Sequence, residues 1–273
     1  AFLGSVARAG GDTRLEQAAR RFLDAQTPGY AALFDAEKGL FWGALRPGHP
    51  PSGYHVDRFF SEHRAKTAAV VAYFGRADPA LDAAFLGLKP VYRDYALADG
   101  TRRGIGATWD GGLFQMSWDV PFESAFYAEL PGLARIGEDF LYAAVDEAQR
   151  AGRRGFLSAS GSGEGYDARI GLSALKERPE AVNADAESIY ALAPYFGTHR
   201  ELVLAWLARY GGDGPFGPFD AYSGGRWLER YYAVDQGSLV LGLIGRQGRS
   251  LRAFIEREGL LGRFVGLYRE NLK

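Results

Sequence analysis

Apolar residues recur at intervals of three and four along much of the chain, the spacing that places side chains on one face of a helix. In segment 12–26, Leu15, Phe22 and Leu23 share a face, and a proline and a glycine follow. The pattern predicts helices over 12–26, 61–75, 79–95 with a break at Lys89-Pro90, 132–150, 183–196, 199–210, 249–258 and 262–272, and another in the stretch that contains Asp235.

Alternation of apolar and polar residues, which is typical of strands, is confined to short pieces. Segment 33–45 alternates around Gly39 and predicts a small hairpin. Strands and helices do not alternate regularly, which disfavours a parallel α/β sheet. Loops rich in glycine, aromatic and acidic residues are predicted at 47–53, 104–116, 154–167 and 214–223. We therefore expect one all-α domain over residues 1–273, a helical toroid with a small β-hairpin and a loop-lined cleft on one rim.

The stretch 231–241 begins with two tyrosines and carries Asp235 and Gln236 before an apolar run with helical spacing. An aspartate at a helix start commonly accepts hydrogen bonds from the first backbone N–H groups. The alternative is a carboxylate that belongs to a site at the end of the helix. The same two interpretations apply to Glu62, which follows a predicted N-cap at Ser61. It either complements the helix dipole or points into a cleft.

Composition narrows the function classes. The net charge is −1, which does not favour a nucleic-acid partner, and no apolar run is long enough to span a membrane. The chain has no cysteine, which excludes disulfides and thiolate chemistry. The four histidines lack metal-site spacing, and no phosphate-binding glycine motif occurs, so we expect no metal and no cofactor. The oligomeric state cannot be read from the sequence.

Aromatic residues are abundant, with 15 Tyr, 18 Phe and 5 Trp. A large hydrophobic core uses many such side chains, but they also suit a carbohydrate cleft, where aromatic faces stack on sugar rings. The chain begins at Ala1, from which we expect a start trimmed by processing or by design, and no signal peptide is recognised.

Five segments together resemble the glucoamylase-like glycosidase group, which includes bacterial β-1,2-glucanases and the transglycosylase domain of cyclic β-1,2-glucan synthases. They occur in the family's order and span most of residues 30–245. The segments are 60–64 (FSEHR), 109–116 (WDGGLFQM), 155–160 (GFLSAS), 217–222 (GPFDAY) and 234–238 (VDQGS). The resemblance implies an (α/α)-barrel, a glycoside hydrolase or transglycosylase acting on a bacterial polysaccharide such as a β-glucan, and a periplasmic or secreted location.

Three features depart from the family pattern. Gln115 stands where the family has a glutamate, and an amide can hold a sugar hydroxyl but cannot transfer a proton. Ala159 stands where the synthase branch has a glutamate. The chain is also shorter than a complete twelve-helix barrel, which implies a reduced or open barrel.

Cleavage of a glycosidic bond needs two carboxyl groups, one on each side of the bond. By the resemblance, Glu62 is the first candidate for nucleophile or base. The acid needs a raised pKa near aromatic side chains, which fits Asp110 or Glu123 equally, and Asp235 is a reserve catalytic candidate. The predicted substrate-binding residues are Trp42, Arg64, Trp109, Gln115, Trp118, Asp119, Asp220, Tyr222, Tyr232 and Gln236.

Core packing explains each of these aromatic side chains as well as substrate stacking does. Two alternatives to an enzyme therefore stay open. One is a non-catalytic glycan-binding domain on the same scaffold, which Gln115 and Ala159 favour. The other is a structural helical interaction domain, in which the acids would not converge on one cleft.

Overall fold

The computed structural model describes residues 10–46, 48–163 and 165–273, and about half of them lie in helices. The α-helices are α2 (Thr13–Asp24), α3 (Thr27–Leu33), α4 (Arg64–Phe74), α5 (Ala83–Leu86), α6 (Leu113–Ser117), α7 (Val120–Glu123), α8 (Pro131–Arg150), α9 (Arg200–Tyr210), α10 (Ala233–Ile244), α11 (Gln247–Arg257) and α12 (Leu261–Asn271). Four 3₁₀ helices join them: η1 (Pro79–Asp82), η2 (Ser124–Phe126), η3 (Ser173–Leu175) and η4 (Tyr190–Gly197).

Short antiparallel sheets accompany the helices, so the fold is mainly helical rather than all-α. One sheet has the order β1 (Phe34–Asp35), β2 (Leu40–Trp42), β3 (His55–Val56), and another has the order β12 (Arg226–Leu228), β11 (Ala221–Ser223), β8 (Ala186–Ser188). The two-stranded sheets are β4 (Tyr92–Ala96) with β5 (Arg102–Gly106), β6 (Ser160–Ser162) with β7 (Gly165–Asp167), and β9 (Asp213–Gly214) with β10 (Gly217–Pro218).

Most predicted helices are confirmed, including α8 and α9, whose bounds differ from the prediction by one residue at most. The hairpin at 33–45 is confirmed as β1 and β2, in which Phe34 pairs with Phe41. The predicted loops 47–53 and 154–167 each contain one residue outside the described ranges. The described part of 154–167 is not only loop, because it also forms the β6–β7 hairpin. The predicted loops 104–116 and 214–223 are likewise loop only in part, because β5 and α6 extend into the first, and β9, β10 and β11 into the second.

Two helix predictions are wrong in part. Segment 79–95 is helical only as far as Leu86, and β4 follows, in which Tyr95 pairs with Arg103 and is buried. Segment 183–196 begins with β8 and continues as the 3₁₀ helix η4, which contains Pro194. Proline lacks the N–H group that a regular α-helix needs, which accounts for the departure at η4.

The N-cap predicted at Ser61 is also wrong. Helix α4 begins at Arg64, and the residue before it, His63, makes no side-chain capping hydrogen bond. The Ser61 hydroxyl donates instead to the carbonyl of Arg58, at 3.0 Å. Ser61 and the two residues after it therefore lead into the helix from outside its first turn.

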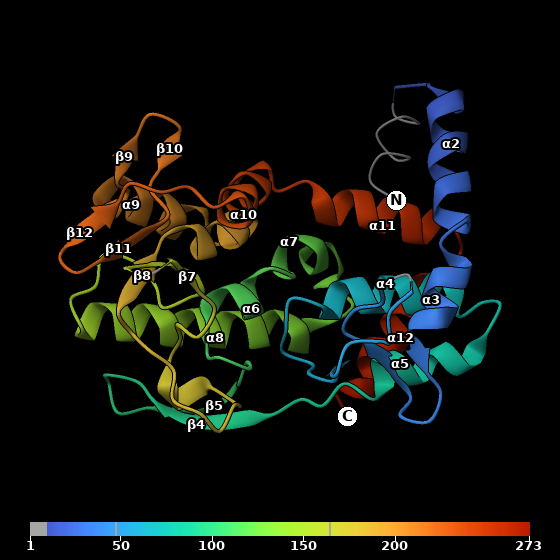
Figure 1. Ribbon diagram of the computed structural model, residues 1–273, viewed down its shortest axis with the longest axis horizontal. Helices are drawn as coiled ribbons and strands as arrows, with labels where there is room; N and C mark the ends of the chain where they lie inside the picture. Colours follow the sequence, from blue (N-terminus) through green and yellow to red (C-terminus); the bar gives the residue numbers. More distant parts are fainter. Residues whose placement is uncertain (1–9, 47, 164) are drawn as a thin grey trace.

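The first and last helices of the described residues lie on the same side of the molecule. Figure 1 shows α2 to α5 next to α11 and α12, while α8, α9 and β6 to β12 form the other side. Arg20 of α2 forms an ion pair with Glu258, and Arg263 of α12 forms one with Asp82. We call these the terminal side and the central side, and α6 and α7 lie between them.

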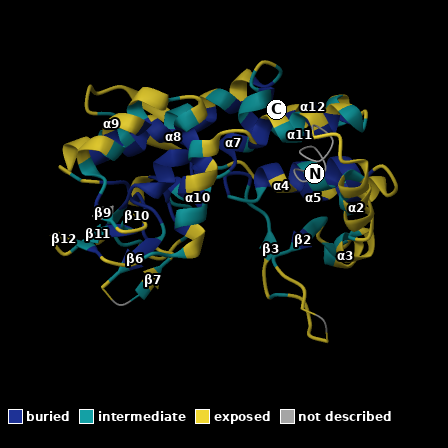
Figure 2. Ribbon diagram, turned by 90° about the horizontal axis from the view of Figure 1, so that it is seen from above, coloured by how far each residue is buried: buried dark blue, intermediate teal, exposed yellow. Residues whose placement is uncertain are grey.

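Helix α8 is the longest helix of the described residues and supplies much of the core. Its face with Phe140, Leu141 and Ala144 is buried, as the dark blue ribbon in Figure 2 shows. Removing such apolar surface from water is the main stabilising contribution to a fold of this kind.

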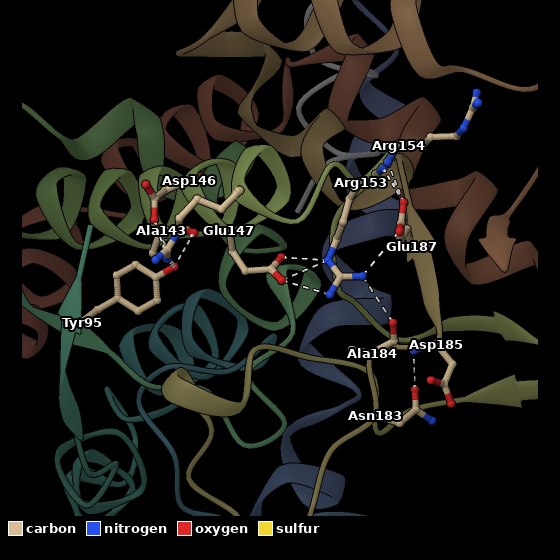
Figure 3. A network of polar contacts seen from close by, with 12 residues as sticks. Tyr95, Ala143, Asp146, Glu147, Arg153, Arg154, Asn183, Ala184, Asp185 and Glu187 are labelled. Carbon is tan, nitrogen blue, oxygen red and sulfur yellow. Dashed lines mark hydrogen bonds and ion pairs between the residues drawn. The ribbon is translucent and has the colours of Figure 1, made fainter. Parts of the chain in front are cut away.

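A polar network joins the end of α8 to β8 (Figure 3). The Arg153 guanidinium donates to both carboxylate oxygens of Glu147 at 3.0 Å and to Glu187 at 3.4 Å. The Glu187 carboxylate also accepts the backbone N–H groups of Arg154 at 2.6 Å and Gly155 at 3.2 Å. The segment after α8 is thereby held against the sheet that leads into η4.

Candidate active site

A cleft of about 520 Å³ opens between the β2–β3 segment, the start of α4 and the residues around α6. Its walls come from separate parts of the chain: Lys38, Leu40, Tyr54, His55, Val56, Asp57, Arg58, Ser61, Glu62, His63, Trp109 and Gln115. Three of the predicted site residues, Glu62, Trp109 and Gln115, therefore border the same space. A cavity of this size is within the usual range for a small-molecule site.

Glu62 presents a partly exposed carboxylate to the cleft. Its Oε1 lies 3.8 Å from Nε2 of His63, and no lysine or arginine among the described residues lies within ion-pair distance of it. The Nδ1 atom of His63 is 3.1 Å from the ammonium of Lys66. Burial, followed by the charge of Lys66, lowers the pKa of His63 below its usual value, so the ring is neutral at pH 7.

Asp110 is held next to the cleft by a closed set of polar contacts. Its Oδ1 accepts a hydrogen bond from Arg178 at 2.7 Å, and its Oδ2 accepts one from the Gln115 amide at 3.0 Å. The Gln115 Oε1 in turn accepts the backbone N–H of Asp110 at 3.0 Å. A Cβ atom at Gly171 would lie 2.0 Å from the Asp110 carbonyl, so the close crossing of the two segments requires glycine. Both oxygens of the Asp110 carboxylate are thus engaged within the protein.

Trp109 is 37% exposed and stands at the edge of this network. The Arg58 guanidinium lies 4.8 Å from the centre of the indole, which is cation–π geometry. Trp42 lies near the same cleft, because its ring stacks on His55 with centroids 3.9 Å apart. An aromatic face, carboxylates and an amide around one cleft are groups that recognise sugar rings.

A fully buried ion pair joins the first residue of α4, Arg64, to the last residue of α7, Glu123. Arg64 donates from Nε to Oε1 of Glu123 at 2.8 Å and from Nη2 to Oε2 at 2.7 Å, and the Tyr268 hydroxyl donates to Oε1 at 2.7 Å. Arg64 and Glu123 are each 1% exposed, and neither residue borders the cleft. This placement favours a structural role for the predicted acid Glu123 and the predicted substrate ligand Arg64.

Asp119 lies next to this pair and is also buried. Its Oδ2 is 3.9 Å from Nε of Arg64 and has no hydrogen-bond partner among the described groups. Burial, with the charge of Glu123, raises the pKa of Asp119 well above its usual value, although Arg64 acts in the opposite direction. Asp119 and the predicted ligand Trp118 border a second pocket, of about 310 Å³.

Two further acids meet at the start of α10. Asp235 is fully buried in the first turn, and the residue at the N-cap position is Tyr232, so Asp235 is not the cap. The Tyr166 hydroxyl donates to Oδ1 of Asp235 at 3.2 Å, and the backbone N–H of Gly161 donates to Oδ2 of Asp220 at 2.6 Å. The other oxygen of each acid has no conventional donor among the described groups.

Burial, followed by a hydrogen bond and the charge of Asp220, raises the pKa of Asp235 to about 9. Two neighbouring carboxyl groups cannot both ionise without cost, so the pair holds a proton at neutral pH. The proton accounts for the two unpartnered oxygens, because a protonated carboxyl can donate to its neighbour.

Gly242 allows α10 to lie directly on η4, since a Cβ there would be 2.4 Å from the carbonyl carbon of Ala193.

The remaining predicted ligands divide between two places. Tyr232 lies edge-on to Tyr166, with centroids 5.0 Å apart, and therefore belongs with the acid pair. Gln236 donates to the Pro218 carbonyl at 3.0 Å, and Tyr222 lies under the Arg154 guanidinium, away from the cleft. Sequence reasoning missed Arg58, Tyr54, Arg178 and Tyr166. An aromatic residue in a loop rich in glycine and serine was the available signal for Tyr166.

No protein-family model matches the sequence, and no curated protein is significantly similar to it. Solved structures do share its fold. An endo-β-1,2-glucanase from Talaromyces funiculosus in complex with sophorose has a TM-score of 0.81 at 14% identity over 98% of this chain. A mutant of that enzyme with β-1,2-glucan has a TM-score of 0.79 at 12% identity, again over 98% of this chain.

An endo-β-1,2-glucanase from Chitinophaga pinensis, in complex with sophorotriose and glucose, has a TM-score of 0.61 at 16% identity over the full chain. This chain spans 60% of the length of the Talaromyces protein and 68% of the Chitinophaga protein. The resemblance to β-1,2-glucanases is thus confirmed at the level of the fold. In the described part of the chain, no helix is both long and apolar enough to cross a membrane.

Proposed function

We propose that this chain is a glycoside hydrolase domain that acts on a β-linked glucan bound in the cleft beside Glu62. The observation that carries the proposal is the partly exposed carboxylate of Glu62, which borders the same cleft as Trp109. Among the described residues, no lysine or arginine lies within ion-pair distance of it. The fold it shares with endo-β-1,2-glucanases supports the same conclusion. We further infer that the helices form an incomplete (α/α) toroid around this cleft.

Hydrolysis would use one carboxyl group from each side of the molecule. Glu62 comes from the terminal side and serves as base or nucleophile, and Asp235 comes from the central side and serves as the proton donor. In Figure 2, α10 and β7 lie across from α4 and β3. A carboxyl with a pKa of about 9 carries a proton at neutral pH, as a general acid requires. Tyr166 is 41% exposed and hydrogen-bonded to Asp235, so its hydroxyl links the buried acid to the solvent side.

A non-catalytic glycan-binding domain is the second candidate, and one observation favours it. Asp110 and Glu123, the acids first predicted as proton donors, are both held in ion pairs with arginine. Gln115 supplies an amide where the family has an acid. Under this alternative, Glu62 and Gln115 would bind sugar hydroxyls and no bond would be cleaved.

Release of reducing ends from β-1,2-, β-1,3- and β-1,4-glucans separates the two candidates. We expect turnover of the β-1,2-linked polymer, and a loss of roughly 10²–10⁴-fold in the Glu62→Gln and Asp235→Asn variants. Glu201→Gln, at an exposed position on α9, is the matched control and should retain full activity. Binding of the polymer without turnover would favour the second candidate, and full activity of Glu62→Gln would remove Glu62 from the mechanism.

A further inference from the structure

Two side chains at the start of α4 meet beside the cleft. His63 immediately precedes the helix and Lys66 lies three residues further on, a spacing that brings side chains together on one face. The Lys66 ammonium is 3.1 Å from Nδ1 of His63. An ammonium group only donates hydrogen bonds, so Nδ1 accepts this one through its lone pair and carries no proton.

The single proton of the neutral His63 ring is therefore on Nε2. Burial, followed by the charge of Lys66, lowers the pKa of His63 and keeps the ring neutral at pH 7. The Nε2 atom lies 3.8 Å from Oε1 of Glu62. This separation is longer than a hydrogen bond, and a small rotation of the Glu62 side chain would close it. The start of α4 thus presents an N–H group, rather than a lone pair, to the Glu62 carboxylate.

The other charged side chains of the cleft are paired elsewhere. Arg58 forms ion pairs with Asp57 and Glu177, His55 with Asp35, and Lys38 with Glu37. Asp119, the residue before α7, is the acid that faces Lys66 from the protein interior. Among the described residues, His63 is therefore the only ionisable nitrogen group within 4.0 Å of Glu62.

We propose that Lys66 and His63 are positioning residues for Glu62. The Lys66 ammonium fixes the His63 ring as the Nε2–H tautomer, and the Nε2–H group keeps the Glu62 carboxylate ionised and directed into the cleft. No proton leaves His63 in this role. The inference rests on the proposed function, because it concerns the carboxylate that serves there as base or nucleophile.

Nitrogen-15 NMR of the histidine rings tests the first half of the proposal, since a protonated ring nitrogen and one with a lone pair resonate far apart. The chain has four histidines, so His63→Gln assigns the signals of His63. We expect a neutral ring with its proton on Nε2 at pH 7. Lys66→Met should move the titration of His63 to higher pH, because it removes a nearby positive charge. Lys89→Met, the same substitution at an exposed position, should leave it unchanged.

Carbon-13 NMR of the Glu62 carboxyl group, assigned with Glu62→Gln, tests the second half without requiring turnover. His63→Phe removes the N–H group, so Glu62 should protonate at a pH higher by roughly 0.5 unit. In glucan hydrolysis, the acid limb of the pH–rate profile should move in the same direction, and kcat should fall about tenfold with KM little changed.

Two variants complete the comparison. His63→Gln should recover most of the loss in kcat, because an amide can accept from Lys66 and donate to Glu62 at the same time. His49→Phe, at an exposed position, is the matched control and should change neither the titration of Glu62 nor the rate.

The outcomes distinguish this inference from the proposed function. A His63 proton on Nδ1, or a Glu62 titration that is unchanged in His63→Phe, would overturn the inference whatever the activity. Full activity of His63→Phe beside an inactive Glu62→Gln would also overturn it and leave the proposed function standing. No cleavage of any glucan, with both NMR results as expected, would overturn the proposed function and support the control of Glu62 by Lys66 and His63.

Discussion

The molecule contains two buried clusters of acidic residues, and the two differ in what neutralises their charge. In the first cluster, the Glu123 carboxylate accepts two short hydrogen bonds from the Arg64 guanidinium. At the start of α10, Asp220 and Asp235 face each other, and no arginine or lysine forms an ion pair with either among the described residues. The first cluster is neutralised by a cation and the second by a proton.

This difference shows which cluster can exchange protons. A carboxylate paired with an always-protonated guanidinium is fixed as an anion, so Arg64 and Glu123 hold α4 against α7 and α12. A carboxyl that keeps its proton because of burial and a like-charged neighbour can release it to another group. The comparison therefore supports a structural role for the first cluster and the proposed proton-donor role for the second.

The largest expected effect follows from removing the cation of the first cluster. Arg64→Met would leave Glu123 buried without its partner, which should lower the free energy of unfolding by about 3–5 kcal/mol. Urea denaturation at pH 7 measures this change. Arg252→Met is the matched control, because Arg252 makes the same two-bond pair with Glu129 at a partly exposed position and should lose about 1 kcal/mol or less.

A second substitution sharpens this test. Adding Glu123→Leu to Arg64→Met removes the unpaired charge and should recover part of the lost stability, although the Tyr268 hydroxyl then loses its acceptor. If Arg64→Met costs no more than Arg252→Met, the buried pair does not anchor the terminal side.

An intermediate effect is expected at the second cluster, as a dependence of stability on pH. The pKa of Asp235 is raised to about 9 in the folded protein, above its value in the unfolded chain, so the folded state binds the proton more tightly. The free energy of unfolding should therefore fall as pH rises from about 4 to 9. Asp235→Asn removes this contribution and should gain about 1–3 kcal/mol relative to the unsubstituted protein between pH 5 and pH 8.

Urea denaturation at the two pH values measures this relative gain. Asp185→Asn, at an exposed position before β8, should leave the pH dependence unchanged. An equal stability difference between Asp235→Asn and the unsubstituted protein at pH 5 and pH 8 would contradict a proton held by the acid pair.

The smallest expected effect concerns the hydroxyl that contacts Asp235. The hydrogen bond from Tyr166 lowers the pKa of Asp235, in opposition to burial and Asp220. Tyr166→Phe removes this bond and should move the titration of Asp235 to higher pH. Carbon-13 NMR of the aspartate carboxyl groups follows this titration, and Tyr222→Phe, on β11, is the control. A move to lower pH would show that Tyr166 stabilises the protonated form instead.

The sequence predicted those elements whose signal is local. The apolar periodicity of α8 and α12 is contained within each helix, and their bounds were predicted to within one or two residues. Strand β4 was missed because it depends on pairing with β5, which the residues of β4 alone do not indicate. The order of the motifs indicated the fold, and three predicted site residues, Glu62, Trp109 and Gln115, border one cleft. The predicted acids Asp220 and Asp235 are not among the residues that line it.

The electrostatic roles could not be predicted, because each depends on a partner far away in the chain. Glu123 is a plausible acid by its aromatic neighbour, but Arg64, 59 residues earlier, engages both of its oxygens. Asp235 owes much of its raised pKa to Asp220 and to burial, neither of which its own segment reveals. Charge pairs across the fold therefore distinguish a carboxylate that is fixed as an anion from a carboxyl group that keeps its proton.

The close packing of α10 on η4 limits how that helix can move. With Gly242 against the Ala193 backbone, α10 packs on η4 without a side chain between them, so α10 cannot shift without displacing η4. The β2–β3 side of the cleft, in contrast, carries partly exposed residues such as His55 and Val56. A conformational change of the domain should therefore alter that side of the cleft before it alters the surroundings of Asp235.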